Sequence, residues 1–329
     1  MFFSRRGVVS RGVRSVLALG LLTAFASLAQ AQTGTPIKLL VGFPAGAGTD
    51  AIARTLAEKL KDELGVPVVV ENRAGAGGQI AAQALKASPA DGHTFFLTHD
   101  HSISILPQVV KKPGYAPQQD FTPLGGFATF VNGLAVSPGT PVKSVPEFVE
   151  WVKAQGGKGS VGIPAPASTP EFLVQLIGKR YGLDLTTVPY KGSAPMMADM
   201  LGNQIPAGVG SVQDFIEYQR AGKLQMIAVL GAQRQTAMPD VPTLDEAGLK
   251  GFNIGTWFGI LAPAGTPKEV AERLNTELVK IIHSPEFRKR MEEIGADPIG
   301  NTQEQMAQQI KSETEKFAKL VKDGKVSVD

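Results

Sequence analysis

One stretch near the start of the chain, residues 38–60 (KLLVGFPAGAGTDAIARTLAEKL), constrains the fold more than any other. It opens with a short apolar run that is typical of a buried strand, and it then breaks into a turn of glycine, alanine and proline. Apolar residues follow at Ile52, Leu56 and Leu60, which is the spacing of one helix face. We therefore predict a strand, a tight turn and a helix in direct succession.

This succession makes the turn a candidate anion site, because backbone N–H groups and the positive end of a helix dipole point to one place. We predict Thr49 or Asp50 as the N-cap of the helix. A carboxylate on a small molecule is the expected anion, and a nucleotide phosphate is the alternative. The turn lacks the Lys-Ser/Thr ending of a phosphate-binding loop, and Ala51 stands at the third glycine position of a dinucleotide fingerprint. A turn that only connects strand to helix is the remaining alternative.

The first 31 residues are predicted to be a cleaved export signal. Four arginines precede the apolar segment 16–28, and Ala29-Gln30-Ala31 is a typical cleavage site. The apolar segment is short for a membrane anchor, which is the alternative. The general Sec route is favoured over the twin-arginine route, because paired arginines are common in ordinary signals. We therefore expect a periplasmic protein.

Charge and cysteine content exclude several classes of function. The chain has 33 basic and 30 acidic residues, and removal of the four signal arginines leaves 29 against 30. A nearly neutral surface argues against nucleic acid or an anionic membrane as the partner. The chain has no cysteine, which excludes disulfides and thiol chemistry.

The order of strands and helices predicts the α/β class with two lobes. Strands at 39–41, 66–70 and 94–98 alternate with helical segments, as in a parallel sheet whose ligands bind at the carboxyl ends of the strands. The chain then builds a second such unit and returns through the apolar strand 252–263. We predict a clam shell in which each lobe is a mixed, mostly parallel sheet flanked by helices.

The expected boundaries follow from the two places where the chain crosses between the units. Lobe 1 is expected to contain residues 32–134 and 256–329, and lobe 2 residues 135–255. The expected hinges are the glycine-containing segments 132–135 and 254–258.

Other polar segments are expected at the same rim. His99 and His101 flank Asp100 directly after the third strand, but a metal would need a further ligand, so we expect hydrogen bonding instead. Thr169 before Pro170 signals a helix start, and Ser211 begins a capping-box-like sequence. Tyr190 either forms an aromatic wall of the site or simply packs its turn. Both interpretations of Tyr190 stay open at this point.

The sequence resembles the Bug, or tripartite tricarboxylate receptor, family of periplasmic binding proteins. The stretches that carry the resemblance occur in order along the chain: 44–54 (PAGAGTDAIAR), 70–78 (VENRAGAGG), 89–94, 188–195 (VPYKGSAP), 221–230, 239–248 (PDVPTLDEAG) and 257–274.

The resemblance implies a two-lobe receptor, similar to type II periplasmic binding proteins, that closes on a di- or tricarboxylate, an acidic amino acid or an aromatic acid. Backbone amides and small hydroxyls would hold the ligand, without a cofactor or metal. The implied partners are the membrane subunits of a tripartite tricarboxylate transporter or a sensor kinase, and the receptor would be a monomer. The implied ligand-binding residues are Phe43, Pro44, Ala45, Gly46, Gly48, Thr49, Asp50, Thr98, His99, Asp100, Ala167, Ser168, Thr169, Tyr190, Gly210, Ser211 and Asp214.

Two segments depart from the family pattern. Phe172 stands where many relatives have a histidine, and the rim segment 98–102 (THDHS) replaces a run of small residues. The alternative function is an exported hydrolase of small carboxylic esters or amides, with Ser168 or Ser211 beside His99. No Gly-x-Ser-x-Gly sequence and no cysteine support it, so we expect a protein that is not an enzyme.

Overall fold

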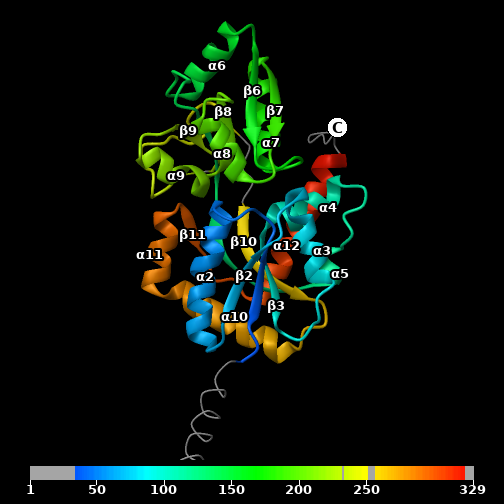
Figure 1. Ribbon diagram of the computed structural model, residues 1–329. Helices are drawn as coiled ribbons and strands as arrows, with labels where there is room; N and C mark the ends of the chain where they lie inside the picture. The colour runs from blue at the N-terminus through cyan, green and yellow to red at the C-terminus, as the bar shows by residue number, and fades with distance from the viewer. Residues whose placement is uncertain (1–33, 232, 251–255, 323–329) are drawn as a thin grey trace, which may run out of the picture.

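The computed structural model describes residues 34–231, 233–250 and 256–322, and the predicted signal peptide at 1–31 lies outside them. The described chain forms two α/β lobes, one above the other in Figure 1. Each lobe contains one sheet with helices packed on it, as predicted. The predicted α/β clam shell of two lobes is therefore confirmed.

The first lobe contains a six-stranded sheet with the order β11-β4-β10-β3-β1-β2. Its strands are β1 (Ile37–Val41), β2 (Val68–Asn72), β3 (Thr94–His99), β4 (Phe121–Phe130), β10 (Thr256–Pro263) and β11 (Ala296–Pro298). Its helices and helical turns are α2 (Gly48–Leu64), η1 (Ala76–Gly78), α3 (Gln79–Lys86), η2 (His101–Ile105), α4 (Leu106–Val109), α5 (Pro117–Asp120), α10 (Lys268–His283), α11 (Pro285–Glu293) and α12 (Gln303–Lys322).

The second lobe contains a five-stranded sheet with the order β7-β6-β8-β5-β9. Its strands are β5 (Asn132–Val136), β6 (Lys158–Ile163), β7 (Asp184–Pro189), β8 (Ala207–Ser211) and β9 (Gln225–Val229). Its helices are α6 (Val145–Ala154), α7 (Thr169–Tyr181), α8 (Ser193–Leu201) and α9 (Val212–Arg220).

Both sheets are mixed, as predicted, although parallel pairing is not in the majority in the described chain. Strand β1 pairs in parallel with β2 and β3, and β6 pairs in parallel with β7 and β8. Every antiparallel pairing involves β5, β10 or β11. Strand β5 is the first after the chain enters the second lobe, and β10 is the first after its return. The antiparallel strands β5 and β10 thus mark where the chain changes lobe.

Strand pairing changes from one lobe to the other at Val131. Phe130 pairs within the first sheet, whereas Asn132 already pairs with Ser211 of the second. This change lies slightly before the expected division after residue 134. The return crossing, with part of the expected hinge at 254–258, falls on residues 251–255, outside the described residues.

Alternate strand residues build the core on opposite faces of the first sheet. Leu39 and Val41 of β1 join the apolar cluster covered by α2, α10 and α11. Leu40 between them joins a second cluster, with Phe96 of β3 and residues of α3 and α12. Successive side chains of β1 point to opposite faces of the sheet, and both faces are buried, as expected for a sheet packed between helices. Because helices cover the faces of the sheet, the ends of its strands remain as the place where the two lobes can meet.

The alternation generates a stability prediction. Phe96 is fully buried, and its replacement by alanine should lower the free energy of unfolding by about 3 to 5 kcal/mol, because a large cavity remains. Val69 on β2 is 52% exposed, and Val69→Ala should cost about 0.5 kcal/mol or less. Denaturant unfolding followed by circular dichroism measures both variants. Equal losses in the two variants would contradict the assignment of faces.

Candidate functional site

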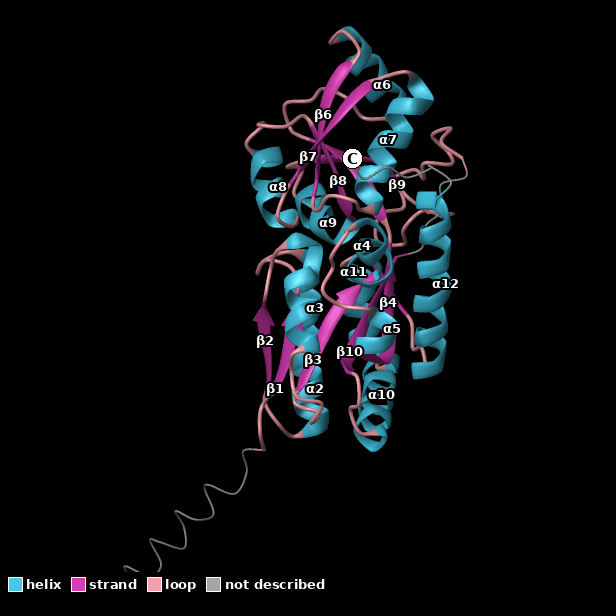
Figure 2. Ribbon diagram, turned by 90° about the vertical axis from the view of Figure 1, so that its right-hand side faces the viewer, coloured by secondary structure: helices cyan, strands magenta, loops and turns pink. Residues whose placement is uncertain are grey.

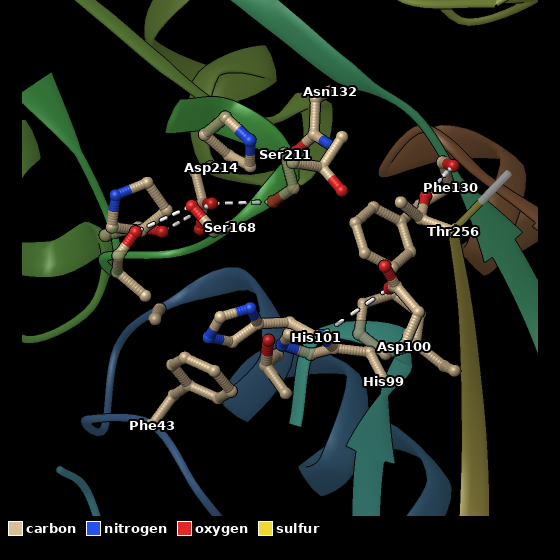
Figure 3. Close-up of a pocket in the computed structure, with 18 residues that line it drawn as sticks. Phe43, His99, Asp100, His101, Phe130, Asn132, Ser168, Ser211, Asp214 and Thr256 are labelled. Atoms are coloured by element: carbon tan, nitrogen blue, oxygen red, sulfur yellow. Dashed lines mark hydrogen bonds and ion pairs between the residues drawn. The ribbon is translucent and has the colours of Figure 1, made fainter. Parts of the chain in front are cut away.

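A cavity lies between the lobes, at the carboxyl ends of β1, β3, β6 and β8 (Figure 3). Strand ends of this kind are where open α/β sheets bind ligands. The space open to the centres of water molecules is about 60 Å³, which is room for a handful of waters or one small molecule. The cavity is lined by Phe43, Ala47, Thr49, His99, Asp100, His101, Phe130, Asn132, Pro164, Ala165, Ser168, Thr169, Pro170, Ser193, Ser211, Asp214, Thr256 and Phe258.

Aromatic rings from the first lobe form one wall of the cavity. Phe43 stacks on the His99 imidazole with 4.8 Å between ring centroids, and Phe130 stacks on Phe258 at 4.4 Å. His99 also meets the edges of Phe130 and Phe258. The result is a largely apolar surface that suits a flat ligand.

The two histidines are uncharged. Burial, together with the neighbouring His101, lowers the pKa of His99 to about 3, and burial lowers the pKa of His101 to about 4. His101 begins η2, a wide π-type turn, and its ring lies over Gly77. A β-carbon at Gly77 would collide with Nε2 of His101, and the φ of this glycine is +64°. Because glycine has no β-carbon, position 77 leaves room for the imidazole ring of His101.

The start of α2 differs from the prediction, because neither Thr49 nor Asp50 is its N-cap. The helix begins at Gly48, after Ala47, which has no side chain capable of capping. The carboxylate of Asp50 instead accepts a hydrogen bond from the Gly46 N–H at 3.0 Å and one from Arg54 at 2.9 Å. A carboxylate in the first turn can reach back to the preceding loop in this way. Although burial opposes them, these hydrogen bonds lower the pKa of Asp50.

The protein's own carboxylate occupies the anion position at the start of α2. Oδ1 of Asp214, from the second lobe, accepts a hydrogen bond from the Gly48 N–H at 3.0 Å. The hydroxyls of Ser193 and Ser211 each donate to its other oxygen at 2.6 Å. Asp214 therefore joins the two lobes, and the amide that was expected to meet a ligand already has a partner.

The second lobe contributes the start of α7. The N-cap is Ser168, one residue before the predicted Thr169. The Ser168 hydroxyl donates to the Ala165 carbonyl at 2.6 Å, whereas Thr169 Oγ1 is buried and without a hydrogen-bond partner among the described residues. Thr169 therefore presents an unused polar atom at the cavity.

The structure brings together part of the predicted set. Eight predicted residues line the cavity: Phe43, Thr49, His99, Asp100, Ser168, Thr169, Ser211 and Asp214. The other nine do not line it: Pro44, Ala45, Gly46, Gly48, Asp50, Thr98, Ala167, Tyr190 and Gly210. Tyr190 borders a neighbouring hollow, and its hydroxyl donates to Asp199 at 2.6 Å.

Sequence reasoning missed the residues that flank the crossings between lobes. Phe130 and Asn132 lie on either side of the first crossing, and Thr256 and Phe258 follow the second. The crossings themselves were the available signal, because strands that connect two lobes must pass the cleft between them.

The arrangement does not support the hydrolase alternative. The Ser168 hydroxyl donates to a carbonyl and the Ser211 hydroxyl donates to Asp214, so neither is paired with His99. A nucleophilic serine needs a base within hydrogen-bond reach. Across residues 34–231, 233–250 and 256–322, no group of three His, Cys, Asp or Glu side chains is placed to hold a metal ion.

The chain matches a family model and several related proteins. The model described as "Tripartite tricarboxylate transporter family receptor" matches residues 52–326. Protein BugT of Bordetella pertussis is 32% identical over 320 residues, which cover 94% of this chain and 97% of BugT.

Two solved structures from Rhodopseudomonas palustris are also similar. A protein solved with adipate has a TM-score of 0.85 and 32% identity, covering 89% of this chain and 98% of that one. MatC, solved with bound malate, has a TM-score of 0.80 and 28% identity, covering 87% of this chain and 98% of that one.

The contact made by Asp214 generates a prediction about how the lobes are held. Asp214→Ala should lower the free energy of unfolding by about 1 to 3 kcal/mol, because three donors lose their acceptor. Asp62→Ala, at an exposed position on α2, the helix that Asp214 contacts, serves as the control and should change the free energy of unfolding by about 0.5 kcal/mol or less. Chemical denaturation measures both, and equal stability of the two variants would contradict a structural role for Asp214.

Proposed function

Because the chain belongs to the tripartite tricarboxylate transporter family of receptors, we propose that it is a periplasmic solute receptor that closes on a small carboxylate and does not transform it. The family match and the likeness to proteins solved with adipate and malate support this proposal. A cavity lined by residues of both lobes suits a receptor of this kind, because the ligand would add contacts to each lobe.

The ligand class that fits best is a monocarboxylate with a flat apolar body, such as an aromatic acid. The lining of the cavity is the observation that carries this proposal. Phe43, Phe130 and Phe258 provide aromatic surface, and no lysine or arginine is among the lining residues of the described chain. Such a surface stabilises an apolar ring by burial, at about 25 cal/mol per Å².

Di- and tricarboxylates fit this cavity less well. The Asp214 carboxylate already lies on one side of the cavity, and the two histidines are uncharged. A second ligand carboxylate would therefore be buried without a positive partner, which costs free energy. The amide group of Asn132 and the hydroxyl of Thr169 remain to hold a single carboxylate.

The family match supports a proposal about the setting of the receptor. We place the protein in the periplasm, after export by the Sec route and removal of residues 1–31, with residues 32–134 and 256–329 in one lobe and residues 135–255 in the other. In the described residues, no helix combines the length and the apolar character needed to cross a bilayer. A monomer that delivers its ligand to the membrane subunits of a tripartite transporter, or to a sensor kinase, is the proposed working form.

Ligand-induced stabilisation tests the proposal. Benzoate at one hundred times its dissociation constant should stabilise the protein by about 2.7 kcal/mol, with no change in the benzoate recovered. Malate and adipate should need higher concentrations for the same effect, and benzylamine, a cation of similar shape, should have none. Calorimetry and thermal unfolding measure this series. A preference for malate over benzoate would refute the ligand class, and no response to any carboxylate would refute the receptor function.

Gly48→Val should prevent closure and abolish benzoate-induced stabilisation. A β-carbon at position 48 would lie 2.9 Å from Cβ of Gln213 and 3.0 Å from the Asp214 carboxylate, so the added side chain would push the lobes apart. Ala45→Val, at an exposed position of the same loop, is the matched control and should bind benzoate normally. Titration calorimetry compares the two. Normal binding by Gly48→Val would show that this contact between the lobes is not needed.

A further inference from the structure

Two carboxyl groups line the cavity, and their surroundings are opposite. Asp214 accepts three hydrogen bonds, as described above, and these satisfy both of its oxygens. Asp100 is 2% exposed, and its Oδ1 atom has no hydrogen-bond partner among the described residues. A buried carboxylate without a partner is costly, so a group in this position either gains a proton or meets a ligand.

Among the residues that the structure describes, no cation next to Asp100 offsets a negative charge there. The closest basic group on its own segment is His99, whose Nδ1 lies 3.7 Å from Oδ1 of Asp100, beyond hydrogen-bond distance (Figure 3). His99 and His101 are uncharged, for the reasons given above. The two imidazoles therefore do not form an ion pair with Asp100.

A further acid approaches Asp100 from the C-terminal helix. Glu313 of α12 accepts a hydrogen bond from the indole N–H of Trp257 and another from Gln309 at 3.2 Å. Burial first, and the negative charge of Glu313 second, raise the pKa of Asp100 well above its usual range. Backbone amides, including those of His101 and Trp257, offset this shift only in part. Asp214 lines the same cavity. Burial raises the pKa of Glu313, while hydrogen bonds from Trp257 and Gln309 and the charge of Lys316 oppose that rise.

We propose that Asp100 is a neutral carboxylic acid that donates a hydrogen bond from Oδ1 to the carboxylate of the ligand. This inference rests on the proposed carboxylate receptor function and adds the residue that recognises the charge. An O–H group that donates to a carboxylate forms one of the stronger hydrogen bonds, and it needs no lysine or arginine. Thr169 Oγ1, buried and unpaired on the opposite lobe, supplies a second donor to the same ligand.

A donor role of Asp100 determines the direction in which benzoate affinity changes with pH. Only protonated Asp100 donates, so benzoate affinity should be constant at low pH and fall about tenfold per unit as pH rises above the pKa of Asp100. Benzoate itself stays ionised throughout a titration from pH 6 to 9, and neither histidine titrates in that range. An ionised Asp100 would instead bind a cationic ligand, and benzylamine would then bind better than benzoate.

Two substitutions at Asp100 separate these cases in the full-length mature protein. Asp100→Asn keeps the size of the side chain and donates through its amide N–H, so it should bind benzoate within a few-fold of the wild type and lose the pH dependence. Asp100→Ala provides no donor and should weaken benzoate binding at least tenfold. Loss of binding in Asp100→Asn would overturn the proposal, as would an unchanged pH profile.

A substitution on α12 and a matched control complete the test. Glu313→Gln removes the nearby acid but keeps an acceptor for Trp257, so the fall in affinity should move to lower pH. Asp199→Asn, a change of the same chemistry outside the cavity lining, should leave the profile unchanged. A Glu313→Gln profile identical to that of the wild type would count against the coupling of the two acids.

An infrared measurement decides the protonation state without any ligand. The carbonyl band of a protonated carboxylic acid should be present in the wild type and reduced in Asp100→Asn at pH 7. No reduction of the band would overturn the proposal even if benzoate binds, and the receptor function would then stand alone. If the band is reduced and no carboxylate binds, the receptor function fails and the role of Asp100 fails with it.

Discussion

The hydrogen bond between the Gly48 N–H and Asp214 determines how the two lobes meet. It joins the first turn of α2 to a carboxylate 166 residues further along the chain. A helix N-terminus attracts negative charge, and here the protein supplies that charge itself. The contact draws the loop of the first lobe against α9, and the cavity closes between them. Part of the hydrogen bonding between the lobes is therefore already formed before a ligand binds.

The same contact explains why the ligand carboxylate is expected elsewhere. With Gly48 engaged, the polar atoms of the cavity that lack a partner in the described chain lie at the end of β3, at the start of η2 and at the start of α7. They belong to His99, Asp100, His101 and Thr169. These groups are uncharged donors in a largely apolar space. Selectivity then comes from the shape of the aromatic wall and from a small number of hydrogen bonds, rather than from attraction between opposite charges.

The sequence predicted the architecture well, because periodicity and turn residues are local signals. The strand and helix around Gly48, the buried face of Ile52, Leu56 and Leu60, and the helix start near Thr169 were all visible in short windows. The cap of α2 was not, because Asp214 is distant in sequence and the nearby Asp50 turns back to Gly46 instead. The aromatic wall was missed for the same reason, since Phe130 and Phe258 pack together only once two crossings between lobes lie side by side.

A small apolar contact on the far side of the interface has a practical use. Phe317 on α12 packs with Phe172 of α7 and Ile105 of η2, so the C-terminal helix of the first lobe contacts the second lobe (Figure 2). When the two lobes move apart, Phe172 has to separate from Phe317 and Ile105, and these side chains become exposed to water. An environment-sensitive dye attached near the end of α12 would therefore change its fluorescence as the lobes part. The chain thus offers the framework of an optical biosensor whose reporter lies outside the lining of the ligand cavity.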